Sequence, residues 1–454
     1  MKNRDELIDV AVTTAEKADD VIVRYVEGRD SQIRFSNGQI DIAKTWTATK
    51  MDVFVAIGHR IGSTQVESTS VGTVRSRVAE LVETTGNMQE SQLYGGISRE
   101  KHTATDTKDL VDPGIEDFGE DAPRLLRGVI EAAQEKGASR VAGSLIFGRD
   151  LIEVRTGQGS RGSYEQSMYE LTVRSFIDPE SSGQGLACGR DMSRVEERFL
   201  AAGESSGELA SMAEGGRQGK PGKYDMIMSP TVAANLLGQF AEGANPLMMM
   251  LGYTPLKDRL GEELGPPGLT VTDDPGMREG LGSRPFDDEV VPTRRVDLFR
   301  EGEFVGVVHN TGTAGQMGAE STGSSHLASF GGSKIPMPWA SNLVFQGGSG
   351  DLETMIGESK KPTIYVTSNW YTRFSNYVEG TFSTIPRDGI FLIENGEIAG
   401  PVRKIRISEN ILDLIRRITQ VGKDVTQIHW WEVDTPTFIP HVKFEGVNVT
   451  AATM

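Results

Sequence analysis

Histidine and cysteine most often hold a catalytic metal or act as nucleophiles, and in this chain they are few and scattered. There are six histidines and one cysteine, and no two histidines stand four residues apart. A tetrahedral zinc site needs three or four nitrogen or sulfur ligands, commonly including a short helical pair. Ligands far apart in sequence can still converge, so His309, His326 and His441 form one candidate set. The alternative is that they are turn or surface histidines.

The single cysteine, Cys188, lies in the segment GQGLACG and has no base close to it in sequence. A nucleophilic cysteine needs a group that stabilises its thiolate, and the sequence shows none nearby. We therefore expect a small buried apolar residue here, with a nucleophile as the alternative. One cysteine also excludes an internal disulfide, so there is no redox argument for secretion.

Two acidic turns lie in a segment rich in loop-forming residues, Gly252–Gly323. Asp273-Asp274 and Asp287-Asp288-Glu289 are candidates for a divalent cation site or for a paired general acid and base. Their spacing is not that of a calcium loop, which alternates its ligands around a central glycine. Aspartates that bond their own backbone in turns explain the pattern equally well. Elaborate loops often carry function on a rigid scaffold, so we include the second turn, with His309, Thr322 and Gly323, among the candidate substrate or interface residues.

Other motifs favour binding over chemistry. The glycine-rich stretch Gly312–Gly318 lacks the lysine and the Ser/Thr of a phosphate-binding loop, so it does not predict a nucleotide site. Met248 and Met249 begin a methionine run, and Trp430 and Trp431 are adjacent. Methionines repack easily at binding surfaces, and tryptophans are enriched at partner contacts. Packing in the core is the alternative for both pairs.

The periodicity of the chain predicts an α+β fold that is rich in antiparallel strands. Apolar spacing indicates helices over Val71–Thr85, Ala122–Lys136, Thr231–Gly243 and Glu409–Val421, with strand-like runs between them. Asn-Gly pairs at 37–38 and 395–396 predict hairpin turns. The expected domains are an N-terminal α/β subdomain (1–90), a linker (91–119), a second α/β subdomain (120–215) and a β-rich, barrel-like C-terminal domain (223–454). A glycine-rich stretch from Gly203 to Gly222 is expected to close the second subdomain.

The composition indicates a soluble protein of several domains. The chain has 454 residues, 53 of them glycine, and Lys+Arg of 47 against Asp+Glu of 64 gives a net charge of −17. This charge disfavours direct nucleic acid binding, which depends on lysine and arginine at the phosphates. No apolar run approaches the roughly 20 residues of a membrane helix. The charged N-terminal segment lacks the apolar core of a signal peptide, so we expect a cytoplasmic location.

The ordered set of motifs resembles the TldD/PmbA family, and specifically its TldE (PmbA) branch. The motifs run from FSNG at 35–38 through GEELGPPGLTVTDD at 261–274 and SRPFDDE at 283–289 to IENGEI at 393–398. Each is weak alone, but together they span some 360 residues in order. The resemblance implies a bipartite N-terminal α/β part with antiparallel sheets and a large β-rich C-terminal domain.

The resemblance also indicates where a reactive centre would be. The TldD branch carries His-Glu-x-x-x-His on a helix and a late cysteine, which together bind zinc. The matching helix here places Gly238 and Gly243 at the histidine positions and Gln239 at the position of the general base. The late segment around Trp430 and Trp431 has no cysteine. We therefore expect no catalytic or metal-binding residue in this chain.

By this resemblance the chain is expected to be the metal-free partner in a heterodimer with a TldD-like protease. Zinc would sit in the partner chain, and the complex would trim unfolded or modified peptides. The expected role here is to close the cleft and help to bind substrate. Two alternatives stay open: a stand-alone homodimeric peptide-binding or regulatory protein, and an independent hydrolase that uses Asp287, Asp288 and His309.

Overall fold

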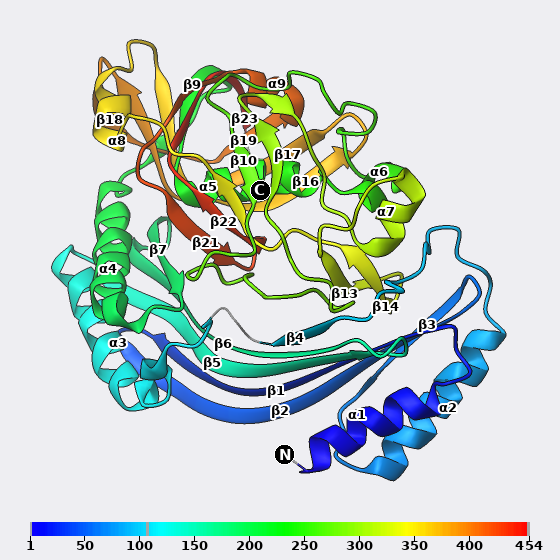
Figure 1. Ribbon diagram of the computed structural model, residues 1–454. Helices are drawn as coiled ribbons and strands as arrows, with labels where there is room; N and C mark the ends of the chain where they lie inside the picture. The colour runs from blue at the N-terminus through cyan, green and yellow to red at the C-terminus, as the bar shows by residue number, and fades with distance from the viewer. Residues whose placement is uncertain (1, 106–108, 452–454) are drawn as a thin grey trace.

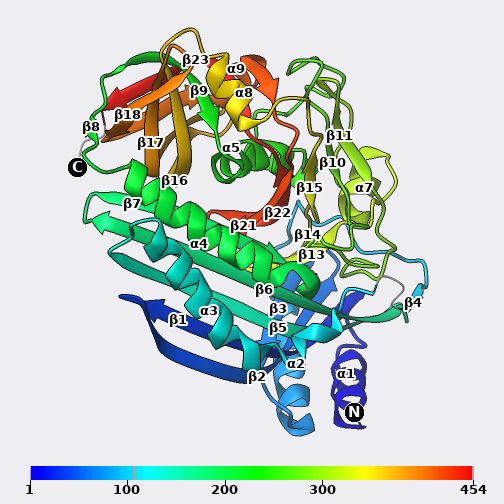
Figure 2. The same cartoon turned by 90° about the vertical axis from the view of Figure 1, so that its left-hand side faces the viewer.

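The computed structural model describes residues 2–105 and 109–451 and shows a curved sheet that holds a β-rich domain on its concave side (Figure 1). The sheet has the strand order β3-β2-β1-β5-β6-β4, with β7 paired to β6. Helices cover the two ends of its convex side, α1 and α2 at one end and α3 and α4 at the other (Figures 1 and 2). Its elements are α1 (Lys2–Thr14), β1 (Asp20–Ser36), β2 (Gln39–Ile57), β3 (Arg60–Val66), α2 (Val71–Gly86), β4 (Thr103–Thr105), η1 (Pro113–Ile115), α3 (Phe118–Glu135), β5 (Arg140–Thr156), β6 (Arg161–Asp178), β7 (Ser181–Gly189), η2 (Met192–Arg194) and α4 (Val195–Met212).

The second half of the chain forms a closed five-stranded β-barrel and a six-stranded sheet. The barrel has the order β16-β9-β23-β19-β17, and β17 closes it by pairing with β16. The six-stranded sheet has the order β12-β11-β10-β15-β22-β21. The elements are β8 (Arg217–Gln218), β9 (Gly222–Met228), α5 (Pro230–Glu242), α6 (Pro246–Leu251), β10 (Val271–Asp273), β11 (Val296–Arg300), β12 (Glu303–Phe304), α7 (Thr311–Met317), β13 (Ser325–Phe330), β14 (Ser333–Pro338), β15 (Leu343–Phe345), α8 (Leu352–Gly357), β16 (Thr363–Asn376), β17 (Thr381–Glu394), β18 (Glu397–Arg403), β19 (Ile405–Asn410), α9 (Ile411–Arg416), β20 (Ile418–Val421), β21 (Thr426–Trp430), β22 (Val433–Ile439) and β23 (Val442–Ala451).

The α+β class and the barrel-like C-terminal part are as predicted. Both Asn-Gly turns are also confirmed, because Asn37 and Gly38 have φ of 49° and 74°, and Asn395 and Gly396 have φ of 53° and 82°. Such turns need positive φ at both central residues, which these residue types adopt at little cost. The segments 1–90 and 120–215 contribute strands to one continuous sheet, in which β1 pairs with β5.

The glycine-rich stretch Gly203–Gly222, which is expected to close the second subdomain, begins inside a helix, because residues 195–212 form α4. The glycines allow close packing on both sides of the helix. A Cβ at Gly203 would lie 2.5 Å from Val129 O of α3. On the other side, Cβ atoms at Gly183 and Gly185 of β7 would overlap backbone atoms of α4. Tertiary packing thus overrides the weak helix propensity of glycine.

The helix expected over Glu409–Val421 is shorter than predicted. It spans Ile411–Arg416 as α9, and the chain then continues as β20. Ile418 pairs with Phe444 of β23, so strand pairing ends the helical periodicity. Helices α2, α3 and α5 confirm the other three predicted helices, over Val71–Thr85, Ala122–Lys136 and Thr231–Gly243.

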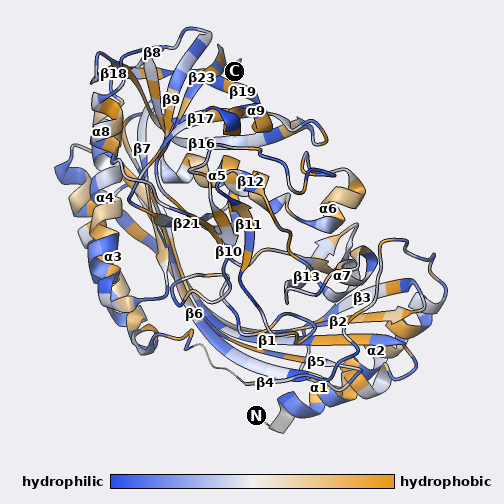
Figure 3. Ribbon diagram, turned by 45° about the horizontal axis from the view of Figure 1, so that its top comes forward, coloured by the Kyte–Doolittle hydropathy of each residue, from blue (hydrophilic) through white to orange (hydrophobic). Residues whose placement is uncertain are grey.

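A hydrophobic interface joins the sheet to the C-terminal domain. Phe286 and Val290 pack with Ile22, Phe54 and Tyr164 of the sheet, and the rings of Tyr164 and Phe286 meet edge to face at 5.3 Å. Figure 3 shows hydrophobic residues on the strands beside α2, whereas the middle of the long strands is more hydrophilic. The predicted loop-rich segment Gly252–Gly323 therefore contributes to the contact between the two halves. Among the described residues, no helix is long and apolar enough to cross a membrane.

Candidate functional site

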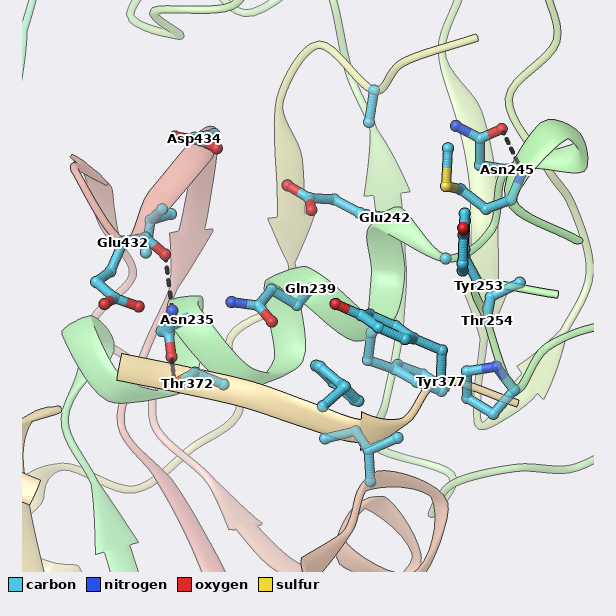
Figure 4. A pocket seen from close by; sticks show the side chains of 18 of the residues that line it. Asn235, Gln239, Glu242, Asn245, Tyr253, Thr254, Thr372, Tyr377, Glu432 and Asp434 are labelled. Atoms are coloured by element: carbon cyan, nitrogen blue, oxygen red, sulfur yellow. Dashed lines mark hydrogen bonds between the residues drawn. The ribbon is translucent and has the colours of Figure 1, made fainter. Parts of the chain in front are cut away.

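A cavity with a volume of about 500 Å³ lies in the C-terminal domain, beside helix α5. Its walls come from α5, the bulged end of β16, the turn between β21 and β22, and the segment after α6 (Figure 4). Ligand pockets in proteins commonly have volumes of about 300–1,000 Å³. The polar and aromatic residues around it include Asn235, Gln239, Glu242, Tyr253, Arg373, Tyr377, Glu432 and Asp434.

Helix α5 begins with a capping serine followed by a proline, and one polar face of the helix lines the cavity. The side chain of Ser229 caps the helix by accepting from Val232 N, and Pro230 occupies the first turn. Asn235, Gln239 and Glu242 follow at i, i+4 and i+7, a spacing that places them on one face. All three line the cavity. The rest of the helix is buried among apolar residues, including Leu236, Leu237 and Phe240.

Asn235 fixes this face of α5 against its neighbours. Its Nδ2 donates to Glu432 O at 2.7 Å, and its Oδ1 accepts from Asn369 Nδ2 at 2.8 Å and from Thr372 Oγ1 at 2.5 Å. Asn369 also donates to Thr384 Oγ1 at 2.9 Å. A buried and hydrogen-bonded polar network of this kind makes a structure rigid. It holds α5, β16 and β17 in register around the cavity.

Glu242 brings a carboxyl group to the cavity without a cationic partner. Among residues 2–105 and 109–451, no Lys, Arg or His nitrogen lies within 4.0 Å of the carboxylates of Glu242, Glu432 or Asp434 in an ion pair. Burial, with a smaller contribution from Asp434, raises the pKa of Glu242 to about 7, and hydrogen bonds from Thr435 oppose this shift. The side chain keeps some surface because it borders the cavity. Figure 4 shows it extending toward the side of the cavity where Asp434 lies.

The positions that match zinc ligands in the TldD branch do not fit a metal. Gly238 and Gly243 have no ligating side chain, and Gln239 has an amide where a general base would carry a carboxylate. A Cβ at position 243 would overlap Thr254 Oγ1 and lie 2.9 Å from Phe240 O. In the part of the chain that the structure describes, no group of three or more His, Cys, Asp or Glu side chains is placed to hold a metal ion. Zinc-activated water needs such ligands, so no zinc chemistry is assigned to these residues.

The acidic turn Asp287-Asp288-Glu289 is part of the structural framework. The carboxylate of Asp287 accepts from the backbone N–H groups of Glu289, Val291 and Ser325, each at 2.9 Å. Asp288 accepts from Leu327 N at 2.7 Å and pairs with Arg24 at 3.3 Å. Burial and the charge of Glu289 raise the pKa of Asp287. Of the two interpretations, the structure supports turn architecture, here at the interface between the two halves.

Asp273 has the same kind of role in the first acidic turn. Its Oδ1 accepts from Ser341 N at 2.8 Å and Asn342 N at 2.9 Å. Burial raises its pKa to about 7. The adjacent Asp274 caps its own turn by accepting from Gly276 N. The carboxylates are therefore directed at local backbone groups.

The three histidines proposed as a zinc set do not come together. His309 Nδ1 contacts Thr313 Oγ1 at 3.2 Å, and burial lowers its pKa. His326 lies close to Asp288, and burial lowers its pKa to about 3. His441 Nε2 contacts Tyr365 Oη in the barrel at 3.3 Å. The hydrolase that would combine Asp287, Asp288 and His309 also lacks its geometry, because His309 contacts Thr313 and both carboxylates bind backbone N–H groups.

Thr322 and Gly323 hold the end of the loop-rich segment. Thr322 Oγ1 accepts from His309 N at 2.7 Å. Gly323 has φ of 66°, and a Cβ there would lie 2.8 Å from Pro292 C. Only glycine fits such an approach without strain. Cys188 is buried with its Sγ against Gln427 O, and burial raises its pKa to about 12, which matches the expected inert residue.

Of the methionine and tryptophan pairs, one residue lines the cavity. Met248 lines it, and Met249 packs against the C-terminal core. Trp430 is 3% exposed, whereas Trp431 is 55% exposed. The ring centroid of Trp431 lies 5.7 Å from that of Trp370 and 6.1 Å from that of Tyr371. Tyr371 of this aromatic group donates its backbone N–H to Glu432 Oε1 at 2.8 Å, and Glu432 lines the cavity.

Several cavity residues were missed in the sequence. Asn235 and Glu242 share a helix face with Gln239, and their i, i+4, i+7 spacing was a usable signal. Arg373 and Tyr377 belong to β16 and the turn after it, and Asp434 belongs to β22. No local pattern connects these residues to α5, because strand pairing far along the chain brings them together.

Family models match two parts of the chain. The PmbA/TldA metallopeptidase C-terminal domain matches residues 221–451, and domain 1 of the same group matches residues 21–87. The chain belongs to the PmbA/TldD family. This confirms the family that the motifs predicted, and similarity to proteins named PmbA and TldE supports the predicted branch.

Relatives in the family share moderate identity with the chain. It is 24% identical over 286 residues to a metalloprotease of Methanocaldococcus jannaschii, which covers 63% of this chain and 62% of the relative. It is 30% identical over 203 residues to the metalloprotease PmbA of Escherichia coli O157:H7, which covers 45% of this chain and 42% of the relative. These matches thus span less than two thirds of each relative. The fold is similar to the crystal structure of TldE from Thermococcus kodakarensis, with a TM-score of 0.82 and 21% identity over 99% of this chain and all of that one.

Proposed function

We propose that this chain is the non-catalytic, substrate-binding subunit of a two-chain zinc metallopeptidase that trims unfolded or modified peptides. Its partner is a TldD-like chain that carries the metal. One observation carries the proposal: a cavity lies beside α5, while the helix positions expected to ligate zinc are Gly238 and Gly243 and the position expected for the general base is Gln239. At position 243 a Cβ would overlap Thr254 Oγ1, so a ligand side chain there would require the neighbouring residues to shift.

The chemistry of the cavity supports binding in place of bond cleavage. Its carboxyl groups have no metal ligands beside them, and the amide of Gln239 cannot accept a proton from water as a general base does. Polar groups on α5 and aromatic rings at the mouth suit an extended peptide, which offers backbone amides and side chains together. The chain would then close the cleft and position substrate for the partner.

The test is purification of the tagged chain from its native cells, followed by metal analysis and peptide hydrolysis assays. We expect a TldD-like protein to co-purify, zinc to follow that protein, and hydrolysis to require both chains. Stoichiometric zinc in the isolated chain, or cleavage by it alone, would overturn the proposal.

A Glu242→Gln variant sharpens this test. Loss of a general base usually costs about 10²–10⁴-fold in rate. Because we assign no catalytic role to Glu242, partner-dependent kcat should fall less than about tenfold in the variant. A larger loss would place the chemistry in this chain.

The alternative is a stand-alone homodimeric protein that binds peptides without proteolysis. Trp431 at 55% exposed and Met250 at 42% exposed are large apolar groups on the surface, which favour contact with some partner. Recovery of self-oligomers alone from native cells would support this second candidate.

A further inference from the structure

The cavity beside α5 has two walls of different chemistry. Glu432, from the turn before β22, and Asp434, from the start of β22, lie on one side, and Glu242 extends between them and the rest of the cavity (Figure 4). Tyr253 and Tyr377 lie on the other side (Figure 4). Carboxylates and aromatic ring faces are the two groups that attract a cationic nitrogen.

One carboxylate of the acidic wall is held in place, and no ion pair to Glu242, Glu432 or Asp434 is found among residues 2–105 and 109–451. Glu432 Oε1 accepts from Tyr371 N at 2.8 Å, which holds its carboxylate beside the cavity. Arg373 is the cationic residue of the lining, but it is exposed, and its Nη1 donates to Thr372 O at 2.7 Å. Three carboxyl groups therefore face a cavity that contains one guanidinium, and that guanidinium is engaged with backbone.

The aromatic wall is an independent feature that selects the same kind of ligand. The rings of Tyr253 and Tyr377 meet edge to face at 5.6 Å, and Phe374 stacks on Tyr377 at 5.5 Å. Tyr253 and Tyr377 are 50% and 49% exposed, so ring faces remain open. A cation within about 6 Å of such a ring is stabilised, and the stem of a lysine or arginine packs on the same surface.

We propose that this cavity binds a cationic nitrogen of a peptide, from a lysine or arginine side chain or from the amino terminus. The inference rests on the proposed function and names the substrate class of that site: extended peptides with a positive charge. Glu242, Glu432 and Asp434 supply the opposite charge, and Tyr253 and Tyr377 contact the adjoining methylene groups. The net charge of −17 also favours the approach of such peptides at low ionic strength.

The experiment measures binding of blocked alanine hexapeptides to the full chain by titration calorimetry. One peptide has a central lysine, one has glutamine in its place, and a third has glutamine and a free amino terminus. At low ionic strength we expect at least one of the cationic peptides to bind about tenfold more tightly than the neutral one, and the preference should shrink as salt rises. Comparison of the two cationic peptides identifies the source of the nitrogen.

Variants connect the preference to the cavity. In Glu432→Gln the amide oxygen can still accept from Tyr371 N, and Asp434→Asn changes an exposed side chain, so both should fold. The double variant should bind charged and neutral peptides within about twofold of each other. Glu208→Gln is the matched control, because it removes one exposed carboxylate on α4 and should keep the preference.

Equal binding of all three peptides by the wild-type chain, or an unchanged preference in the double variant, would overturn this inference. The proposed function has a different readout, because co-purification and partner-dependent hydrolysis do not involve these peptides. Loss of the charge preference with retained partner-dependent hydrolysis rejects only the peptide class. A retained preference with no metal-bearing partner rejects only the two-chain function.

Discussion

At the scale of single residues, Glu242 shows how the cavity affects stability. Its pKa is raised to about 7, mainly by burial, whereas a glutamate in an unfolded chain has a pKa of about 4.3. Between these values the folded protein binds the proton more tightly than the unfolded chain. The free energy of unfolding therefore falls as pH rises through this window, and above about pH 7 the charged carboxylate destabilises the fold.

Glu242→Gln should therefore stabilise the protein in a pH-dependent way. At pH 8 we expect a gain of about 1–3 kcal/mol in the free energy of unfolding, and at pH 4, where both states are protonated, almost no gain. Urea unfolding at the two pH values measures this difference. Glu208→Gln, at an exposed position on α4, should show neither effect; equal gains for Glu242→Gln at both pH values would contradict the assigned cause.

At the scale of elements, the packing of α3 against α4 depends on glycines that sequence alone assigned to a boundary. Gly203 and Gly207 bring the α4 backbone against α3, where a Cβ at Gly203 would lie 2.5 Å from Val129 O. Backbone cannot move aside as a flexible side chain does, so a methyl group there must separate the helices or distort them. The contact with Val129 O shows that these glycines allow the two helices to pack closely. The glycine content of the segment alone does not show this.

Gly203→Ala should destabilise the protein by about 1–3 kcal/mol, although alanine is the better helix former by about 1 kcal/mol. Gly128→Ala in α3 is the control, because its Cβ would meet only the end of the Leu200 side chain, at 3.3 Å. We expect it to be neutral or slightly stabilising. Chemical unfolding of both variants tests this, and a stabilising Gly203→Ala would show that the helices are not in close contact.

Features that neighbouring residues determine could be predicted from the sequence, whereas features that depend on distant segments could not. The turns at Asn37-Gly38 and Asn395-Gly396 depend on neighbouring residues, so their prediction succeeded. Helix α4 was not predicted because its glycines make room for the backbone of α3, and α3 is distant in sequence. The same reason applies to the cavity: the face of α5 was readable from its spacing, but Tyr377 and Asp434 reach it only through strand pairing. Asp287 was a candidate site residue because of its charge, but its carboxylate accepts hydrogen bonds from backbone N–H groups.

At the scale of the whole molecule, ion pairs join the curved sheet to the C-terminal domain. Arg24 of β1 pairs with Asp288 at 3.3 Å, and Asp52 of β2 pairs with Lys334 of β14 at 2.6 Å. They lie beside the hydrophobic interface that contains Phe286. Because a partly buried pair leaves an uncompensated charge when one member is removed, such pairs couple the two halves.

Asp288→Asn should weaken this coupling and cost about 1–3 kcal/mol, because Arg24 loses its nearer carboxylate and keeps Asp52 at 4.0 Å. Differential scanning calorimetry should show a lower Tm and a broader transition, as the two halves unfold less cooperatively. Arg77→Gln, which removes an exposed ion pair with Glu80 on α2, should change stability by less than about 1 kcal/mol. A Tm for Asp288→Asn equal to that of the control would show that the Arg24–Asp288 pair does not couple the two halves.

The contact between position 243 and Thr254 has a consequence for any attempt to build a metal site on α5. The Cβ of a histidine placed at position 243 would overlap Thr254 Oγ1, so Thr254 would have to shift or be replaced by a smaller residue. The hydroxyl of Thr254 accepts from Leu256 N at 3.2 Å, and a shift would strain or break this hydrogen bond. The first substitution toward a ligand at this position would therefore cost stability before it could bind a metal.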